Sequence, residues 1–128
     1  MSLKRIINMM LGVGIDIVKI KKMEEAVRRW GGDFLDRVFN REELEHVAEG
    51  KMYYQRIAAR FAAKEAIIKA ISKKYPMALK DIFILNRPNG APFCKFKKDM
   101  GVSVLLSISH IEDYAVACAV AQKKARYA

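Results

Sequence analysis

The sequence predicts a single-domain α+β protein in which one long central helix packs on an antiparallel sheet. The segment Tyr54–Ser72 is rich in alanine, isoleucine, lysine and glutamate and contains no glycine or proline, which is typical of a long helix. Short apolar segments bounded by turn residues are typical of strands, and they occupy residues 11–18, 82–85, 92–96, 104–109 and 114–121. A chain of 128 residues is expected to form one domain with a core of its own.

The first expected strand has two very different faces. Residues 11–18 alternate with period 2, as in a half-buried strand, so that Leu11, Val13, Ile15 and Ile17 share one face. The other face carries Asp16 beside two glycines, and glycine in a strand often marks the close approach of a ligand or another backbone. We therefore expect Asp16 to stand on a bare face. It could equally cap the helix that follows, because Asp is a preferred N-cap residue.

The segment Ile20–Trp30 predicts an amphipathic helix with a basic outer side, which the pair Gly31-Gly32 ends. This side is either an ordinary solvated face or a docking surface for an acidic helix. A short helical turn is expected over Phe34–Phe39. Asn40 and Glu43 then resemble a capping box that opens a helix to about Glu49.

Glu65 is the residue of the central helix that needs an explanation. The helix is apolar nearly all round, which predicts that it is buried. Buried charges are paired or hold a metal. Glu65 is therefore either half of an i,i+4 pair with Lys69 at the edge of the apolar face or a metal ligand.

Two hairpins are expected after the central helix. The first surrounds the turn Pro88-Asn89-Gly90, and Pro92 indicates an edge position for its second strand. The second is closed by residues 110–113, and its second strand, 114–121, is apolar on both sides, so we expect it to be central or covered. His110 at the strand end is either a turn histidine with local hydrogen bonds or a catalytic residue.

Composition narrows the partners and the compartment. The net charge of +10 favours anionic partners such as nucleic acid, an acidic protein or a phosphate-bearing ligand. Cys94 and Cys118 stand alone in apolar segments, so we expect reduced core residues of a cytoplasmic protein, without a disulfide framework or zinc spacing. No apolar run approaches the ~20 residues of a membrane span, and we expect no membrane partner.

An ordered set of motifs resembles the 4′-phosphopantetheinyl transferase superfamily, most closely its short bacterial members, the holo-acyl-carrier-protein synthases. The motifs run from about residue 10 to 121, whereas residues 73–77 (KKYPM) replace the family's Gly-rich turn. They are GIDIV at 14–18, FLDRVFNREE at 34–43, FAAKEAIIK at 61–69, NGAP at 89–92, in which Ala91 replaces the family's lysine, and SISH at 107–110 followed by Tyr114-Ala115.

The resemblance implies the 4′-phosphopantetheinyl transferase fold, with the domain at residues 10–122. Residues 1–9 would then be an N-terminal extension or a remnant of cloning, and residues 123–128 a basic tail. The implied reaction transfers the 4′-phosphopantetheine group from coenzyme A to a serine of an apo acyl carrier protein, releases 3′,5′-ADP and serves fatty acid biosynthesis. Two carboxylates suit Mg²⁺, which keeps waters and phosphate oxygens as its other ligands.

The resemblance also assigns roles to individual residues. Asp16 and Glu65 would hold Mg²⁺, Glu65 and Lys69 would be catalytic, and Lys22 would dock the acidic carrier protein. Coenzyme A would be bound by Lys69, Asn89, Gly90, Pro92 and His110. Short members of the family assemble as homotrimers with active sites between subunits. The excess of apolar residues, 52% of the chain, agrees with such an interface.

The competing interpretation is a small basic nucleic-acid-binding α+β domain without catalytic activity. It needs exposed aromatic residues among basic residues on a sheet, where bases can stack. Phe93 and Phe96 lie near Lys95 and Lys97 but fall on opposite faces of their strand. This pattern is weak, so we expect no nucleic-acid partner.

Overall fold

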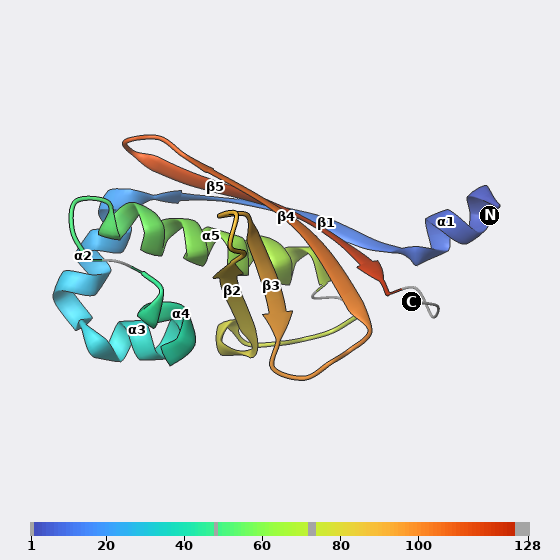
Figure 1. Cartoon of the computed structure of the whole chain (residues 1–128), viewed down its shortest axis with the longest axis horizontal. Helices are drawn as coiled ribbons and strands as arrows, with labels where there is room; N and C mark the ends of the chain where they lie inside the picture. Colours follow the sequence, from blue (N-terminus) through green and yellow to red (C-terminus); the bar gives the residue numbers. More distant parts are fainter. Residues whose placement is uncertain (1, 48, 72–73, 125–128) are drawn as a thin grey trace.

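The computed structural model describes residues 2–47, 49–71 and 74–124 (Figure 1). Its helices are α1 (Leu3–Met9), α2 (Ile20–Trp30), α3 (Gly32–Val38), α4 (Arg41–Glu45) and α5 (Tyr53–Ile71), with a short 3-10 turn at Leu79–Asp81. Its strands are β1 (Met10–Lys19), β2 (Ile82–Asn86), β3 (Pro92–Phe96), β4 (Val102–His110) and β5 (Tyr114–Lys123).

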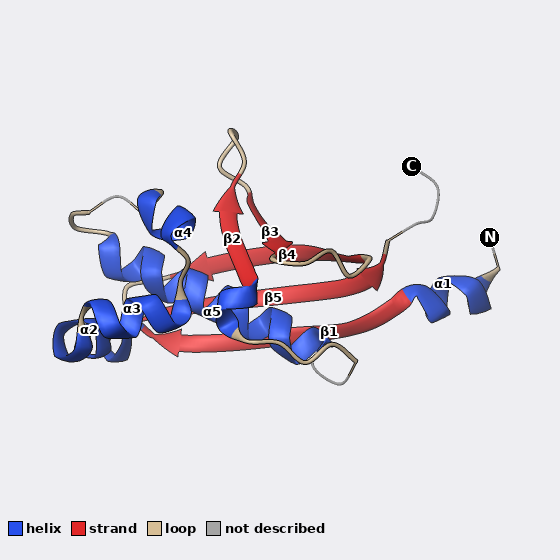
Figure 2. Ribbon diagram, turned by 90° about the horizontal axis from the view of Figure 1, so that it is seen from below, coloured by secondary structure: helices blue, strands red, loops and turns tan. Residues whose placement is uncertain are grey.

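The strands form two antiparallel sheets, and the central helix packs on the larger one. Strands β1, β5 and β4 make a three-stranded sheet in that order, and β2 and β3 make a separate hairpin (Figure 2). The strand that is apolar on both sides, β5, is the central one, as predicted. Helix α5 begins one residue earlier than expected, and the expected last residue, Ser72, lies outside the described residues. The α+β class with a central helix on an antiparallel sheet is thus confirmed.

The two faces of β1 are used in the opposite way to the one expected. Gly12, Gly14 and Asp16 face α5, while Val13, Ile15 and Ile17 are 62–65% exposed. A Cβ atom on Gly14 would lie 1.8 Å from the carbonyl oxygen of Ala66, so the glycine face accommodates the helix backbone. The expectation that the apolar face of this strand is the buried one was wrong, whereas the two glycines do mark the close approach of another backbone.

The same small-residue surface continues into β5. Its inward residues are alanines, and they lie beside the inward residues of β1, as the register pairs Gly12 with Ala121 and Gly14 with Ala119. These alanines are fully buried against α5. Glycine and alanine therefore allow α5 to approach the sheet closely along β1 and β5.

The helices before α5 largely follow the expected pattern. Gly31, with φ of +51°, ends α2, and α3 covers the expected short helical turn. The capping box is present, because the Asn40 N–H donates to Oε1 of Glu43 at 2.9 Å. Helix α4 nevertheless ends at Glu45 rather than near Glu49. The next N–H groups, of His46 and Val47, bond three residues back, a tight turn that closes a helix.

Other expectations concern the chain ends and the cysteines. Cys94 and Cys118 are free thiols, each partly buried. The last strand continues to Lys123, one residue into the expected tail, and residues 125–128 lie outside the described part. Among the described residues, no helix is both long and apolar enough to cross a bilayer.

Candidate active site

Asp16 and Lys69 meet at the contact between β1 and α5. The Lys69 ammonium donates to Oδ1 of Asp16 at 2.9 Å and to the carbonyl oxygen of Ile15 at 3.0 Å. The Asp16 side chain is 16% exposed, and that of Lys69 is 53% exposed. The strand thus orients a carboxylate toward the helix, and a lysine on the helix pairs with it.

In this geometry Asp16 is not a helix cap, and Glu65 does not form an ion pair with Lys69. The N-cap of α2 is Lys19, so Asp16 does not cap that helix. Within the described residues, no ion pair joins Glu65 to Lys69. Lys69 instead bonds across to β1, and Glu65 lies one helical turn before it on α5.

The electrostatics of Glu65 depend on Asp16. Burial raises the pKa of Glu65, the negative charge of Asp16 raises it further, and the positive charge of Lys69 partly offsets both effects. A negative charge that raises the pKa of a neighbouring carboxylate also favours a cation at that place.

Two carboxylates, Asp16 and Glu65, suit Mg²⁺ better than a metal that takes most of its ligands from the protein. No cluster of three or more His, Cys, Asp or Glu side chains able to hold a metal occurs in the described residues. Mg²⁺ is commonly held by one or two carboxylates and completes its shell with waters and substrate phosphates. Asp16 and Glu65 provide that number of carboxylates and leave room for substrate oxygens.

A cleft of about 580 Å³ opens over these two carboxylates. Helix α2 forms one wall and contributes Lys22, an exposed cation. The remaining lining is mainly apolar and comes from Ile17, Val18, Lys19, Met23, Ala26, Phe34, Phe61 and Tyr114. The structure therefore brings together Asp16, Glu65 and Lys22, which lie far apart in the sequence.

A second pocket, of about 420 Å³, gathers most of the residues expected to bind coenzyme A. It is lined by Gly90, Pro92 and His110. Asn89 is not part of its lining; its side-chain oxygen accepts the N–H of Ala91 at 3.0 Å within the turn. The amide side chain that lines the pocket is that of Asn86, at the end of β2.

Three cationic or titratable residues of this pocket were missed by sequence reasoning: His46, Arg56 and Arg60. Arg56 and Arg60 stand four residues apart on α5, a spacing that places both on one face of a helix. That spacing was a signal that could have been used. The two guanidinium groups give the pocket a positive character suited to an anionic ligand, and His46 and His110 add ring nitrogens that can form hydrogen bonds.

The two pockets lie on opposite sides of α5. Asp16 pairs with Ala117 on β5, and Ala117 pairs with Ile108 on β4, which lines the second pocket. Asp16 and Ile108 are thus two strand spacings apart, roughly 10 Å, with α5 packed over the strand between them. The two pockets have no lining residue in common.

The strand that might have served as a nucleic-acid platform does not present stacking surfaces. Phe93 is half-buried with the Arg87 guanidinium 4.7 Å from its ring centre. Phe96 packs against the core cluster under β4. Neither ring of β3 is therefore available as an exposed platform for bases.

Comparison of the sequence with known proteins gives a consistent result. Residues 12–119 match the sequence model of the 4′-phosphopantetheinyl transferase superfamily. The holo-[acyl-carrier-protein] synthase of Thermodesulfovibrio yellowstonii is 37% identical over 112 residues, which cover 88% of this chain and 98% of the relative. That of Protochlamydia amoebophila is 36% identical over 119 residues, covering 88% and 98%.

Comparison of the structure agrees. A holo-(acyl-carrier-protein) synthase from Bacillus anthracis, solved in complex with CoA (3′,5′-ADP), superposes with a TM-score of 0.79 at 30% identity and covers 91% of this chain and 99% of its own. The Helicobacter pylori enzyme in complex with coenzyme A gives a TM-score of 0.75 at 33% identity, covering 86% and 99%.

Proposed function

The chain belongs to the 4′-phosphopantetheinyl transferase superfamily and is an enzyme of the holo-[acyl-carrier-protein] synthase type, and we propose that it transfers 4′-phosphopantetheine from coenzyme A to a serine of an apo acyl carrier protein. The reaction releases 3′,5′-ADP and serves fatty acid biosynthesis in the cytoplasm. The observation that carries this proposal is the cleft lined by Asp16 of β1 and Glu65 of α5, with Lys69 of α5 paired to Asp16.

The residues of the cleft have distinct roles in the transfer. Asp16 and Glu65 would hold Mg²⁺, which when bound neutralises the charge of the diphosphate. Lys69, already directed at Asp16, adds a positive charge for the phosphate oxygens. The chain then needs no nucleophile of its own, because the attacking hydroxyl belongs to the carrier protein.

The proton and the leaving group can be followed through the step. The serine oxygen of the carrier bonds to the pantetheine-side phosphorus, and the bond from that phosphorus to the bridging oxygen breaks. The electron pair leaves with 3′,5′-ADP. The serine proton passes to a base in the cleft, and the carboxylate of Glu65, which lines the cleft, is the candidate that this chain supplies.

The second pocket is proposed to hold the nucleotide end of coenzyme A. Arg56 and Arg60 provide positive charge for phosphate oxygens, His110 adds a ring nitrogen for hydrogen bonding, and Gly90 and Pro92 form the wall beside them. The Bacillus anthracis relative, solved with CoA (3′,5′-ADP), supports a nucleotide ligand for this fold.

The carrier protein is proposed to dock on α2. Lys22 stands at the cleft beside the candidate metal ligands, and Lys19, Lys21, Arg28 and Arg29 add to the exposed basic side of the helix. Complementary charge mainly accelerates association and selects the partner. An acidic carrier helix placed here would present its serine to the cleft.

We further propose a homotrimer whose active sites lie between subunits. The outer face of the three-stranded sheet exposes Val13, Ile15, Ile17 and Leu105, each 62–65% accessible. Contiguous apolar surface of this kind marks an interface. A neighbouring subunit on this face would bring its own nucleotide pocket to the Asp16 cleft. Within one chain, the nucleotide pocket and the cleft lie on opposite sides of α5. The number three rests on the resemblance to the family.

The transfer is tested by following 3′,5′-ADP by chromatography in mixtures of the protein, coenzyme A, Mg²⁺ and an apo acyl carrier protein. We expect release that depends on the carrier. Release without carrier, or none with any acidic carrier, contradicts the proposal.

The shared site is tested by mixing subunits. Asp16→Ala and Gly90→Trp should each be inactive alone, and the co-refolded mixture should regain part of the activity, because some interfaces pair two intact halves. Light scattering should show an assembly larger than the 14.6 kDa chain. Full activity of a monomer, or no recovery despite demonstrated exchange, places each site within one chain.

A further inference from the structure

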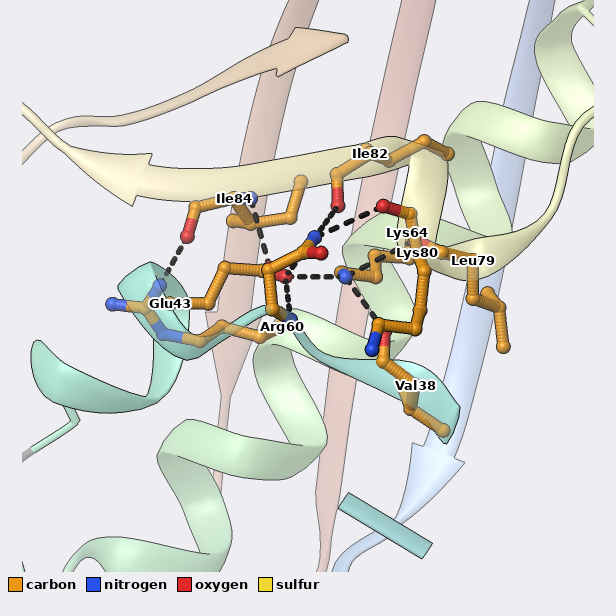
Figure 3. A network of polar contacts seen from close by, with 9 residues as sticks. Val38, Glu43, Arg60, Lys64, Leu79, Lys80, Ile82 and Ile84 are labelled. Carbon is orange, nitrogen blue, oxygen red and sulfur yellow. Dashed lines mark hydrogen bonds and ion pairs between the residues drawn. The ribbon is translucent and has the colours of Figure 1, made fainter. Parts of the chain in front are cut away.

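A buried ion pair joins α4 to α5 beside the nucleotide pocket (Figure 3). The side chains of Glu43 and Lys64 are both 0% exposed, and the Lys64 ammonium lies 2.5 Å from Oε1 of Glu43. The ammonium also donates to the carbonyl oxygens of Val38 at 2.7 Å and Leu79 at 3.1 Å. All three hydrogen atoms of the ammonium thus have acceptors inside the protein.

The same carboxylate holds strand β2 of the hairpin. Oε2 of Glu43 accepts the N–H of Ile84 at 3.0 Å. The carbonyl oxygen of Ile84 accepts a hydrogen bond from the Arg60 guanidinium, whose other nitrogen donates to Oδ1 of Asn86 at 2.8 Å. Both backbone polar groups of one strand residue are therefore bound by charged side chains, Glu43 from α4 and Arg60 from α5 (Figure 3).

Asn40 extends the network to the start of β2. Its amide nitrogen donates to Oε1 of Glu43 at 3.1 Å and to the carbonyl oxygen of Lys80 at 3.0 Å. The capping residue of α4 thus orients the buried carboxylate and also binds the segment that leads into the hairpin.

Stability alone is a weak reason for this arrangement. A buried ion pair is often no more stabilising than apolar side chains of similar volume, because both charges must leave water. Ordinary apolar packing would hold the hairpin against the helix, but the hairpin could still shift by a residue along the direction of β2. Hydrogen bonds to a single residue, Ile84, do fix that position, since a shift of one residue would break them.

The residues that the network fixes are residues of the nucleotide pocket. Arg60, Ile84 and Asn86 line it, and the turn that follows contributes Gly90 and Pro92. Lys64 lies one helical turn after Arg60 on α5 and two turns after Arg56. The buried pair therefore stands directly behind the wall of the pocket, without touching its interior.

We propose that Glu43 and Lys64 are positioning residues for the nucleotide end of coenzyme A. They act through Ile84 and Arg60, and they set the distance between the cations of α5 and the hairpin turn. This inference rests on the proposed function, because it concerns the same pocket. It assigns Glu43 and Lys64 a role in nucleotide affinity rather than in chemistry or carrier docking.

The test removes both charges together. Glu43→Leu/Lys64→Met leaves no uncompensated buried charge and keeps the volume similar, while the Ile84 N–H loses its acceptor. Affinity for 3′,5′-ADP, measured by titration calorimetry, should fall about tenfold, the loss expected for one charge-assisted hydrogen bond. The KM for coenzyme A should rise in parallel, and the KM for the carrier protein should stay near the wild-type value. The midpoint of thermal unfolding should fall, because the Ile84 N–H and the carbonyl oxygens of Val38 and Leu79 lose their buried partners, so affinity and KM are measured well below that midpoint.

Glu42→Gln is the matched control. Glu42 is the neighbouring residue of α4 and pairs with Lys95 of the same hairpin at 3.2 Å, but both side chains are about half-exposed. Its loss should leave nucleotide affinity unchanged, because exposed pairs contribute little. If the double variant does not fold, Asn40→Ala, which keeps both charges and removes the amide that orients Glu43, replaces it, and a weakening of at least twofold is expected.

The outcomes separate the inference from the function on which it rests. A folded variant with wild-type nucleotide affinity overturns the inference while the transferase stands. An equal rise in the KM for the carrier also overturns it, since that result reports general loosening. Wild-type protein that neither binds 3′,5′-ADP nor transfers the group overturns the proposed function and the inference with it.

Discussion

Replacing Gly14 by alanine introduces one methyl group into the contact between β1 and α5. The added Cβ would lie 1.8 Å from the carbonyl oxygen of Ala66 and 2.9 Å from the backbone nitrogen of Ala70. Real Cβ contacts are essentially never shorter than 3.0 Å, so strand and helix must separate by roughly an ångström. Both neighbours are backbone atoms in a helix, which cannot move aside as a flexible side chain would.

The expected cost follows from this rigidity. Overpacking a core by a methyl group typically costs about 1–3 kcal/mol, and a clash with helix backbone places Gly14→Ala at the upper end, about 3 kcal/mol. For a domain of this size the midpoint of thermal unfolding should fall by roughly 10 °C.

The same separation should impair transfer more than it impairs folding. Asp16 lies two residues along β1 and pairs with Lys69 across the contact that the methyl group opens. A misplacement of about 1 Å in a reacting constellation can lower the rate about a hundredfold. We therefore expect turnover of the folded variant to fall by about two orders of magnitude at a temperature well below its unfolding midpoint.

Calorimetric unfolding and steady-state transfer are the assays, with Gly32→Ala as the matched control. Gly32 opens α3 with no atom within 4 Å of the added Cβ and without a positive φ, so its substitution should be neutral or slightly stabilising. A Gly14→Ala protein with the unfolding midpoint and turnover of the wild type would show that β1 does not pack on α5 as closely as described.

Two further predictions concern the cleft and its rim. Glu65→Gln should abolish most transfer, yet it should raise the unfolding midpoint of the metal-free protein at pH 7. Folding raises the pKa of Glu65, so the stabilising contribution of this residue is complete below its unfolded pKa of about 4.3. That contribution is lost as the pH rises through the folded pKa. Melts at pH 4 and pH 7 test this, and a variant less stable than the wild type at pH 7 counts against it. Lys22→Glu should raise the KM for the carrier at low salt and leave that for coenzyme A unchanged; an unaltered carrier KM would remove α2 from the docking surface.

The sequence predicts the elements of this fold well because each carries its own local signal. The period-2 pattern of β1, the helix-forming composition of α5 and the doubly apolar β5 all led to the observed elements. The choice of which face of β1 is buried is not a local property. Alternation defines two faces, but the face that is buried is the one on which a helix packs, and α5 packs on the face with the glycines.

Some residues of the candidate site were predicted from the sequence, and others became visible only in the tertiary structure. Asp16, Glu65 and Lys22 were found from motif and pattern, and the structure brings them to one cleft. Glu43 was expected as the last residue of a capping box and of the motif at 34–43, but nothing in its surroundings along the chain indicates a buried lysine 21 residues later. Such a pair forms across two helices and a hairpin, so it becomes visible only when the tertiary fold is known.

The intact mass of the carrier protein tests the central claim most directly. An apo acyl carrier protein is incubated with coenzyme A, Mg²⁺ and either the wild-type protein or Glu65→Gln, and is then weighed by mass spectrometry. We predict that the wild-type protein converts the carrier to a species heavier by one phosphopantetheine group, and that Glu65→Gln leaves it almost unchanged in the same time. A carrier of unaltered mass with the wild-type protein, or full conversion by Glu65→Gln, would contradict the assignment of transfer to this cleft.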